Sequence, residues 1–261
     1  MTPSVSCLML TRDRPALADR AIRCFAAQTH PARELVIVSQ GDADYRARLR
    51  TSLSEHGVRD AVLVTADPEL RLGELRNLSL DAASGELVCV WDDDDLSHPD
   101  RLSAQVAALR TAGCHTLFLS EHLQHSEADR ALHWIDWRRP PAAEYPLLPS
   151  TMITTRDPEF RYPEHGPYRH LGEDWALLIA LHRRVPVHHL SGQPQLYVYT
   201  FHGRNVFPAG HHDRLRIRSR PRGDLLADEP RIRSAVATLG LRPPVTVAGA
   251  DGVAFTIGGG G

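Results

Sequence analysis

Short apolar segments alternate with helical patterns through the first 120 residues of the chain, and this alternation limits the folds open to it. The helical patterns repeat apolar residues on one face, as Leu17, Ala21 and Phe25 do after the first segment. Strands separated by helices form βα units, so the pattern predicts an α/β fold with a mostly parallel central sheet and helices on both faces. The expected strands are residues 5–10, 35–38, 61–64, 87–91 and 116–119.

Polar residues follow several of these strands at the point where each strand ends. They are Thr11-Arg12, Ser39-Gln40 and the acidic run of residues 92–95. Ligands of open parallel sheets bind at the carboxyl ends of the strands. We therefore expect these three groups to lie at one rim and to form one candidate pocket.

The acidic run Asp92-Asp93-Asp94-Asp95 is the strongest chemical signal in the chain. Adjacent carboxylates repel one another, and a divalent cation with a preference for hard oxygen ligands neutralises them. The sequence alone leaves two other readings open, a solvent-exposed acidic loop and a structural Ca²⁺ site.

The second half of the chain is less regular. A proline-rich loop is expected over 139–149, and a helix after Gly172-Glu173-Asp174, where Trp175, Leu178 and Leu181 recur at helical spacing. The expected strands are residues 133–137, 151–154, 187–190 and 196–200.

Two segments near the C-terminus have unusual composition. Arginine alternates with other residues over 213–222, which indicates either a solvated edge or mobile arm, or a site for phosphate or acidic lipid. Residues 258–261 are glycines and are expected to form a flexible tail.

Composition excludes several classes of protein. The formal net charge is −2, so the chain lacks the basic surface of a nucleic-acid-binding protein. No segment has the length of a membrane span or the pattern of a signal peptide, and we expect a cytoplasmic protein. Widely spaced cysteines are expected to be small buried hydrophobes in a reducing compartment, namely Cys7, Cys24, Cys89 and Cys114.

An ordered set of motifs over residues 4–206 resembles the family 2 glycosyltransferases, which have the GT-A fold and transfer sugar from a nucleotide sugar. Those motifs are residues 5–12, residues 35–41, Leu72-Gly-Glu-Leu-Arg-Asn77, Ala83-Ser-Gly-Glu86, Asp92-Asp-Asp-Asp-Leu-Ser-His-Pro99, Gly172-Glu-Asp174 and Tyr199-Thr-Phe-His-Gly-Arg-Asn205. The resemblance implies a nucleotide-sugar-binding half at 1–120, an acceptor-side and catalytic half at 121–206 and a C-terminal extension at 207–261.

The resemblance also implies roles for the acidic run. Asp92 and Asp93 are expected to contact the nucleotide, while Asp94 reaches a Mg²⁺ or Mn²⁺ ion that bridges the diphosphate. His202 matches a family histidine that can bind the same ion, and an imidazole ligand favours manganese. The alternative for His202 is an ordinary surface or hydrogen-bonded histidine.

Asp174 matches the place where the family keeps its general base, with Glu173 in a supporting or capping role. In an inverting transfer, a carboxylate removes the proton of the acceptor hydroxyl as that hydroxyl attacks the anomeric carbon. The alternative is helix capping, because acidic residues are stabilised at a helix N-terminus without any catalytic role.

Nucleotide contacts are expected from Thr11, Arg12 and Arg76, since a guanidinium can pair with phosphate or stack on a base. The alternative for Arg76 is an exposed helix arginine paired with Glu74 or Asp81. Many family members carry Asp-Asp-Gly after the second strand, whereas this chain has Ser39-Gln40-Gly41. The Gln40 amide offers a donor and an acceptor to a base, so the sequence leaves the preferred base open.

Together these features predict a metal-dependent inverting glycosyltransferase that uses a nucleotide-sugar donor and a hydroxyl-bearing acceptor. That acceptor is a glycan, a lipid-linked sugar, a natural product or a protein, and residues 214–222 are a candidate for peripheral membrane contact. Two other classes remain open at this point. One is a Mg²⁺-dependent phosphohydrolase or nucleotidyltransferase, and the other is a non-catalytic module that binds sugar nucleotides.

Overall fold

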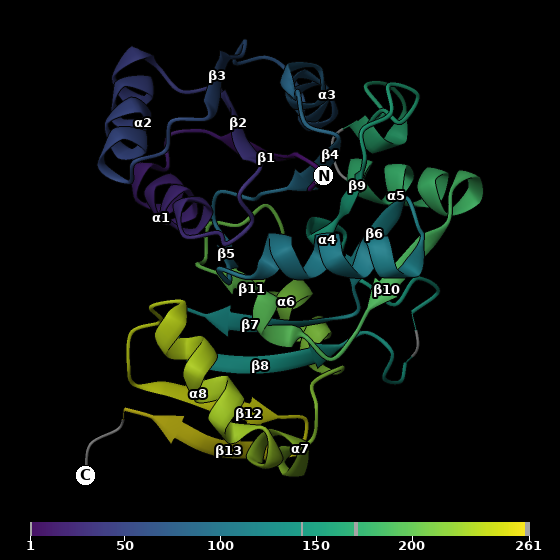
Figure 1. Cartoon of the computed structure of the whole chain (residues 1–261). Helices are drawn as coiled ribbons and strands as arrows, with labels where there is room; N and C mark the ends of the chain where they lie inside the picture. The colour runs from purple at the N-terminus through teal and green to yellow at the C-terminus, as the bar shows by residue number, and fades with distance from the viewer. Residues whose placement is uncertain (1, 142, 170–171, 259–261) are drawn as a thin grey trace. The chain divides into compact units, whose positions relative to one another are not determined.

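The computed structural model describes residues 2–141, 143–169 and 172–258, and the chain divides into two compact units (Figure 1). The first unit comprises Met1–Asp94, Pro99–Phe118 and Pro149–His188. The second comprises Asp95–His98, Leu119–Leu148 and His189–Gly261. The chain passes between the units several times, so each unit is built from segments that are distant in sequence.

The first unit is built on a seven-stranded sheet with the strand order β10-β6-β9-β4-β1-β2-β3. Strand β1 is parallel to β2 and β4, and β2 is parallel to β3, whereas β9 runs antiparallel to β4 and β6. The predicted mostly parallel sheet is therefore confirmed. The strands are β1 Val5–Thr11, β2 Arg33–Ser39, β3 Ala61–Thr65, β4 Leu87–Val90, β6 Thr116–Leu119, β9 Ile153–Thr155 and β10 Val187–Leu190.

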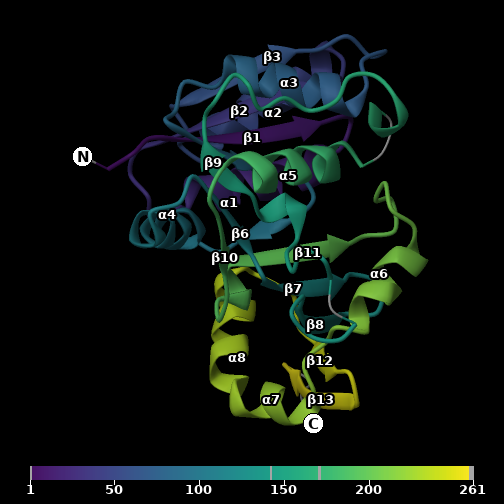
Figure 2. The ribbon, with the colours of Figure 1, turned by 90° about the vertical axis from the view of Figure 1, so that its right-hand side faces the viewer.

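Helices cover both faces of this sheet, with α1 and α2 on one side and α3 and α5 on the other (Figures 1 and 2). Pro15 opens α1, where its missing N–H costs no hydrogen bond, and the Asp42 carboxylate caps α2 by accepting from the Tyr45 N–H at 2.7 Å. The helices are α1 Pro15–Ala26, α2 Ala43–Glu55, α3 Leu72–Ala82, α4 Arg101–Ala112 and α5 Glu173–Arg184, with short 3₁₀ turns η1 Pro149–Thr151 and η2 Pro167–Arg169.

The core of the first unit lies along the central strands. Cys7, Met9 and Ile37 are fully buried, and Leu8 and Val36 on the other face are buried as well. Such strands are apolar on both faces because helices cover both faces of the sheet. This explains why the strands of the first unit read as continuous apolar runs in the sequence.

The second unit contains a second sheet, of which the sequence predicted two strands, over 133–137 and 196–200, without predicting that they belong to a separate sheet. Its strand order is β13-β12-β8-β7-β11-β5, and α6, α7 and α8 complete the unit. The elements are β5 Leu96–Ser97, β7 Glu121–Ser126, β8 Ala131–Asp136, η3 Pro194–Leu196, β11 Tyr197–Phe201, α6 Ala209–Arg216, α7 Arg222–Ala227, α8 Glu229–Thr238, β12 Val245–Gly249 and β13 Gly252–Ile257.

The arginine-rich segment over 213–222 is part of this second unit, and the prediction of a mobile arm is wrong. Ser219 forms a bridge with Ile135 at the edge of β8, and the Arg220 guanidinium lies 3.2 Å from Glu121 and 3.2 Å from Asp136. The same guanidinium lies over the Trp134 ring at 4.8 Å. Buried carboxylates and an aromatic face therefore hold the segment in place.

The predicted flexible tail at 258–261 falls mostly outside the described residues, which end at Gly258. None of the helices in the described ranges combines the length and the apolar character needed to cross a bilayer.

The described part of the second unit buries four histidines, namely His125 on β7 and three whose pKa is lowered, His122 on β7, His133 on β8 and His212 on α6. Burial lowers the pKa of His122 to about 3. Burial, aided by the charge of Arg216, lowers the pKa of His133 to about 4, and burial with His211 lowers the pKa of His212 to about 4. These side chains are therefore neutral in the folded state at neutral pH.

This burial predicts that the second unit loses stability in mild acid. An unfolded histidine titrates near pH ~6.5, so the unfolded chain binds more protons than the folded chain below that pH, and stability falls as pH falls. We expect the wild-type protein to lose about 1.4 kcal/mol per pH unit relative to His122→Gln below pH ~6. The Gln oxygen can still accept from Trp137, whose indole N–H lies 3.2 Å from His122 Nδ1.

The measurement is the free energy of unfolding of both proteins in urea across this pH range. The difference between the two proteins is the informative quantity, because carboxylates with raised pKa values act in the opposite direction. A difference that stays constant with pH would contradict the prediction.

Candidate active site

The acidic run alternates between partly exposed and buried carboxylates. The side chains of Asp92 and Asp94 are 23% and 15% exposed. Asp93 and Asp95 are 2% and 4% exposed. Only Asp92 and Asp94 of this run therefore offer carboxylate oxygens to a ligand from solvent.

Asp93 joins the ends of β1 and β4. It accepts from the Thr11 hydroxyl at 2.6 Å and from Arg14 at 2.5 Å, and Thr11 also bonds to the Tyr45 hydroxyl. Burial and the neighbouring charge of Asp94 raise the pKa of Asp93 to about 7, although Arg14 opposes this rise. Thr11 and Asp93 thus have structural partners, and their contact with a nucleotide stays a prediction.

Asp95 belongs to the second unit, where it accepts from the Thr200 N–H at 2.7 Å and from the Tyr197 hydroxyl. Both partners lie on β11. The fourth acid of the run is therefore fixed inside its own unit by hydrogen bonds.

Arg76 connects the acidic run with the N-terminus of α5. Its Nε lies 3.0 Å from Glu173 Oε1, and its terminal nitrogen lies 3.7 Å from Asp92 Oδ1. The guanidinium also lies 5.5 Å from the centre of the Tyr162 ring. Glu173 is only 2% exposed and the Arg76 side chain 14%, so this charge pair is largely enclosed by protein.

The alternative of an exposed helix arginine is wrong for Arg76. Glu74 accepts from the Arg71 N–H at 2.8 Å, and Asp81 pairs with Arg161 at 2.5 Å. Both acids of α3 that lie near Arg76 in sequence have other partners, and Arg76 points to Asp92 and Glu173 instead.

Two residues of α3 set the position of this helix against the segment that carries Tyr162. A Cβ at Gly73 would lie 2.1 Å from the Pro163 carbonyl oxygen, so only glycine permits the close approach. The Asn77 amide donates to the Tyr162 carbonyl and accepts from the Tyr162 N–H, both at 2.9 Å. Arg76 lies between these two residues and is therefore held at a defined place.

Asp174 is the second residue of α5, and its Oδ1 accepts from the Trp175 N–H at 2.7 Å. Burial raises the pKa of Asp174 to about 6, helped by the charges of Glu173 and Asp92 and opposed by Arg76. The carboxylate lines a small hollow together with Arg76 and Tyr162. Asp174 thus serves the helix terminus and also faces the charged groups of the site.

Asp92, at the start of the acidic run, and Asp174 therefore lie beside the same arginine in the first unit, and their common role in catalysis stays a prediction. The common neighbour is Arg76, which contacts Asp92 directly and Glu173 beside Asp174. The sequence did not predict the contacts of Arg14 or Tyr45, because hydrophobic periodicity carries no sign of them. Tyr162 is one of the aromatic residues of 130–170 that the sequence offers either for stacking on an acceptor sugar or for packing, and in the structure it lies against Arg76.

Of the remaining predicted residues, Gln40 and His202 have local partners. The Gln40 amide nitrogen donates to the carbonyls of Asp67 at 2.9 Å and Leu70 at 3.0 Å, and Arg12 is exposed. His202 belongs to the second unit, where its Nδ1 accepts from the Arg204 N–H at 3.3 Å. Nucleotide binding by Gln40 and Arg12 and metal binding by His202 stay predictions.

Within the described ranges, no three His, Cys, Asp or Glu side chains converge as a ready-made metal site. A nucleotide-bound Mg²⁺ or Mn²⁺ does not require one, because such ions are held by one or two carboxylates together with substrate phosphates and water. The partly exposed carboxylates of Asp92 and Asp94 fit a cation of that kind.

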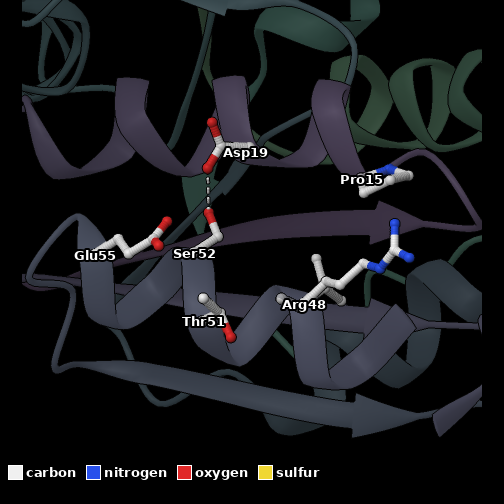
Figure 3. Close-up of a pocket in the computed structure, with 7 residues that line it drawn as sticks. Pro15, Asp19, Arg48, Thr51, Ser52 and Glu55 are labelled. Atoms are coloured by element: carbon white, nitrogen blue, oxygen red, sulfur yellow. Dashed lines mark hydrogen bonds between the residues drawn. The ribbon is translucent and has the colours of Figure 1, made fainter. Parts of the chain in front are cut away.

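A separate hollow of about 220 Å³ lies between α1 and α2, and none of the site acids lines it (Figure 3). Asp19 accepts there from the Ser52 hydroxyl at 2.7 Å and contacts His56 at 3.0 Å. These contacts connect the two helices, and the hollow offers no second arrangement of catalytic groups.

Comparison with known proteins defines the class. The family model described as glycosyl transferase family 2 matches residues 6–148. A search of curated protein sequences finds no significant match. The chain belongs to glycosyl transferase family 2, and it is a glycosyltransferase with the GT-A fold.

Solved structures with a similar fold are glycosyltransferases of low sequence identity. S. aureus TarS 1–349 in complex with UDP has a TM-score of 0.62 at 16% identity, covering 90% of this chain and 80% of that chain. The same protein with UDP-GlcNAc has a TM-score of 0.58 at 15% identity, covering 92% and 68%. The mannosyltransferase PcManGT from Pyrobaculum calidifontis, in complex with GDP-Man and Mn²⁺, has a TM-score of 0.55 at 16% identity, covering 94% and 72%.

The enclosed pair of Arg76 and Glu173 generates a stability prediction. Arg76→Met leaves the buried Glu173 carboxylate without its guanidinium, and we expect a loss of about 3 to 5 kcal/mol in the free energy of unfolding. The double variant Arg76→Met/Glu173→Gln removes both charges and should recover most of that loss. Urea unfolding of the wild type, both single variants and the double variant gives the coupling energy. Additive effects of the two substitutions would contradict an enclosed pair.

Proposed function

We propose that the chain is a metal-dependent inverting glycosyltransferase, with Asp174 as general base and with Asp92 and Asp94 at the cation and nucleotide diphosphate. The observation that supports this most is the Arg76 contact with both Asp92 and Glu173, because it unites the acidic run and Asp174 in one site. The donor is a nucleoside diphosphate sugar, and the acceptor is an alcohol.

The donor end of the site is the acidic run. Asp92 and Asp94 supply the exposed carboxylates for Mn²⁺ or Mg²⁺, and His202 is a further candidate ligand that favours manganese. Once bound, the cation supplies a Lewis acid that stabilises the charge of the departing diphosphate. Arg76, whose charge persists at any working pH, contributes a second positive group beside the same phosphates.

The acceptor end of the site is Asp174. The acceptor oxygen forms a bond to the anomeric carbon from the side opposite the diphosphate, while the bond between that carbon and the diphosphate oxygen breaks. The hydroxyl proton passes to the Asp174 carboxylate, and the products are the glycosylated acceptor and the nucleoside diphosphate. A pKa of about 6 suits this role, since the base is ionised at neutral pH yet more basic than an exposed carboxylate.

We expect Gln40 to contact the nucleotide base only as a hydrogen-bond acceptor, through its side-chain oxygen. Both amide hydrogens of Gln40 have carbonyl partners in the loop at Asp67 and Leu70, which leaves its oxygen for another donor. That oxygen can accept from the ring N–H of uracil or guanine and from the amino group of cytosine or adenine, so Gln40 alone leaves the preferred base open. The amide then replaces the aspartate of other family members as a hydrogen-bond acceptor.

Substitution separates the two ends of the site. Asp174→Asn should abolish transfer, by a factor of at least about 10² in kcat, and keep nucleotide binding, because it removes only the proton acceptor. Asp94→Ala should weaken Mn²⁺-dependent binding of UDP or GDP. Asp44→Asn changes an exposed carboxylate on α2 and serves as the control. Transfer assays and calorimetric titration measure these effects, and full transfer by both variants would refute the proposal.

The pH profile tests the identity of the base. A base must be deprotonated to accept the hydroxyl proton, so kcat/KM should fall about tenfold per pH unit below the pKa near 6. Because the charge of Glu173 raises the pKa of Asp174, Glu173→Gln should move this acid limb to lower pH. The measurement is kcat/KM against pH for both proteins, with folding followed by circular dichroism. If Glu173→Gln leaves the acid limb at the same pH, the limb reports the titration of a group other than Asp174.

A further inference from the structure

Arg14 already pairs with two carboxylates of the acidic run, for which the sequence predicted only a metal cation. Arg14 lies 2.5 Å from Asp93 and 3.0 Å from Asp94, with a different terminal nitrogen on each. Arg20 donates to the backbone carbonyl of Asp94 at 2.6 Å. The Asp94 carboxylate therefore has a positive partner within the protein itself.

The buried side of this arrangement holds Arg14 in place. Asp93 is enclosed and also accepts from Thr11, so its contact with Arg14 is the stronger of the two. Asp94 is partly exposed and receives the other terminal nitrogen of the same planar group. A guanidinium anchored at Asp93 thus keeps a fixed positive charge at Asp94.

A divalent cation at Asp94 would meet this fixed charge at short range. Two positive groups on one carboxylate repel each other, and the partial burial of the site limits screening by water. A diphosphate that arrives with the cation offsets the repulsion, because its oxygens carry negative charge and accept from a guanidinium. The cation alone has no such compensation.

We infer that Arg14 is a built-in counter-ion that makes Asp94 a weak ligand for a free divalent cation and a strong one for a cation bound to diphosphate. The inference rests on the proposed function, which takes Asp94 as the cation ligand. Arg14 is then a positioning residue that couples the two binding events. By thermodynamic linkage, cation and diphosphate strengthen each other's binding by the same factor.

The test measures the affinity of the full chain for Mn²⁺ by electron paramagnetic resonance of the free ion, with and without UDP or GDP. Arg14→Gln should bind Mn²⁺ alone about tenfold more tightly than the wild type, and the added nucleotide should improve its affinity less. Arg14→Lys keeps the positive charge and should bind Mn²⁺ alone as weakly as the wild type does. Arg50→Gln, an exposed arginine on α2, should match the wild type.

A second set of variants controls for the loss of the charge partner of the buried Asp93. Arg14→Gln leaves Asp93 without its guanidinium, which can impair folding or offer Asp93 to the metal as a new ligand. Arg14→Gln/Asp93→Asn removes both charges and should keep the tighter binding of Mn²⁺ alone. Adding Asp94→Ala to this pair should abolish the gain.

The outcomes separate the inference from the proposed function. If wild-type Mn²⁺ binding depends on nucleotide and on Asp94 but both Arg14→Gln proteins match the wild type, the counter-ion role is overturned and the proposed function stands. If the wild type binds no Mn²⁺ with either nucleotide, both are overturned.

Discussion

The candidate active site depends on one enclosed charge, the guanidinium of Arg76. The carboxylates of Asp92 and Glu173 come from the end of β4 and the start of α5, and without the guanidinium of Arg76 between them their charges would repel. Both carboxylates reach Arg76 from an α3 that packs closely at Gly73, where a Cβ would clash with Pro163, and that Asn77 ties to Tyr162. The groups proposed for donor and acceptor chemistry therefore meet around one arginine.

Pairing of carboxylates with donors inside the protein also extends along the acidic run. Asp93 is buried against Arg14 and Thr11, and Asp95 is bound inside the second unit, so only two of the four acids keep exposed oxygens. The run combines structural anchors with functional carboxylates in alternate positions. A polar cluster of this kind can form at a strand end only because each buried acid has its own donor.

The first unit could be predicted from the sequence because helices bury its strands on both faces, which leaves continuous apolar runs such as residues 35–38. The second sheet could be predicted only in part, through β8 and β11. All six residues of β7 are buried, yet most of them are polar, so no hydrophobic period marks the strand. The order of the motifs singled out Asp174 and Arg76 as candidates. The contacts of Arg14 could not be predicted, because they form only where the ends of β1 and β4 come together in the fold.

The most direct test is a crystal structure of the Asp174→Asn variant with Mn²⁺ and an intact nucleotide sugar, in which anomalous scattering locates the metal. The account predicts a metal peak at the carboxylates of Asp92 and Asp94, and an anomeric carbon close enough to Asn at 174 for an acceptor hydroxyl to lie between them. A metal held elsewhere, or a sugar directed away from position 174, would contradict the account.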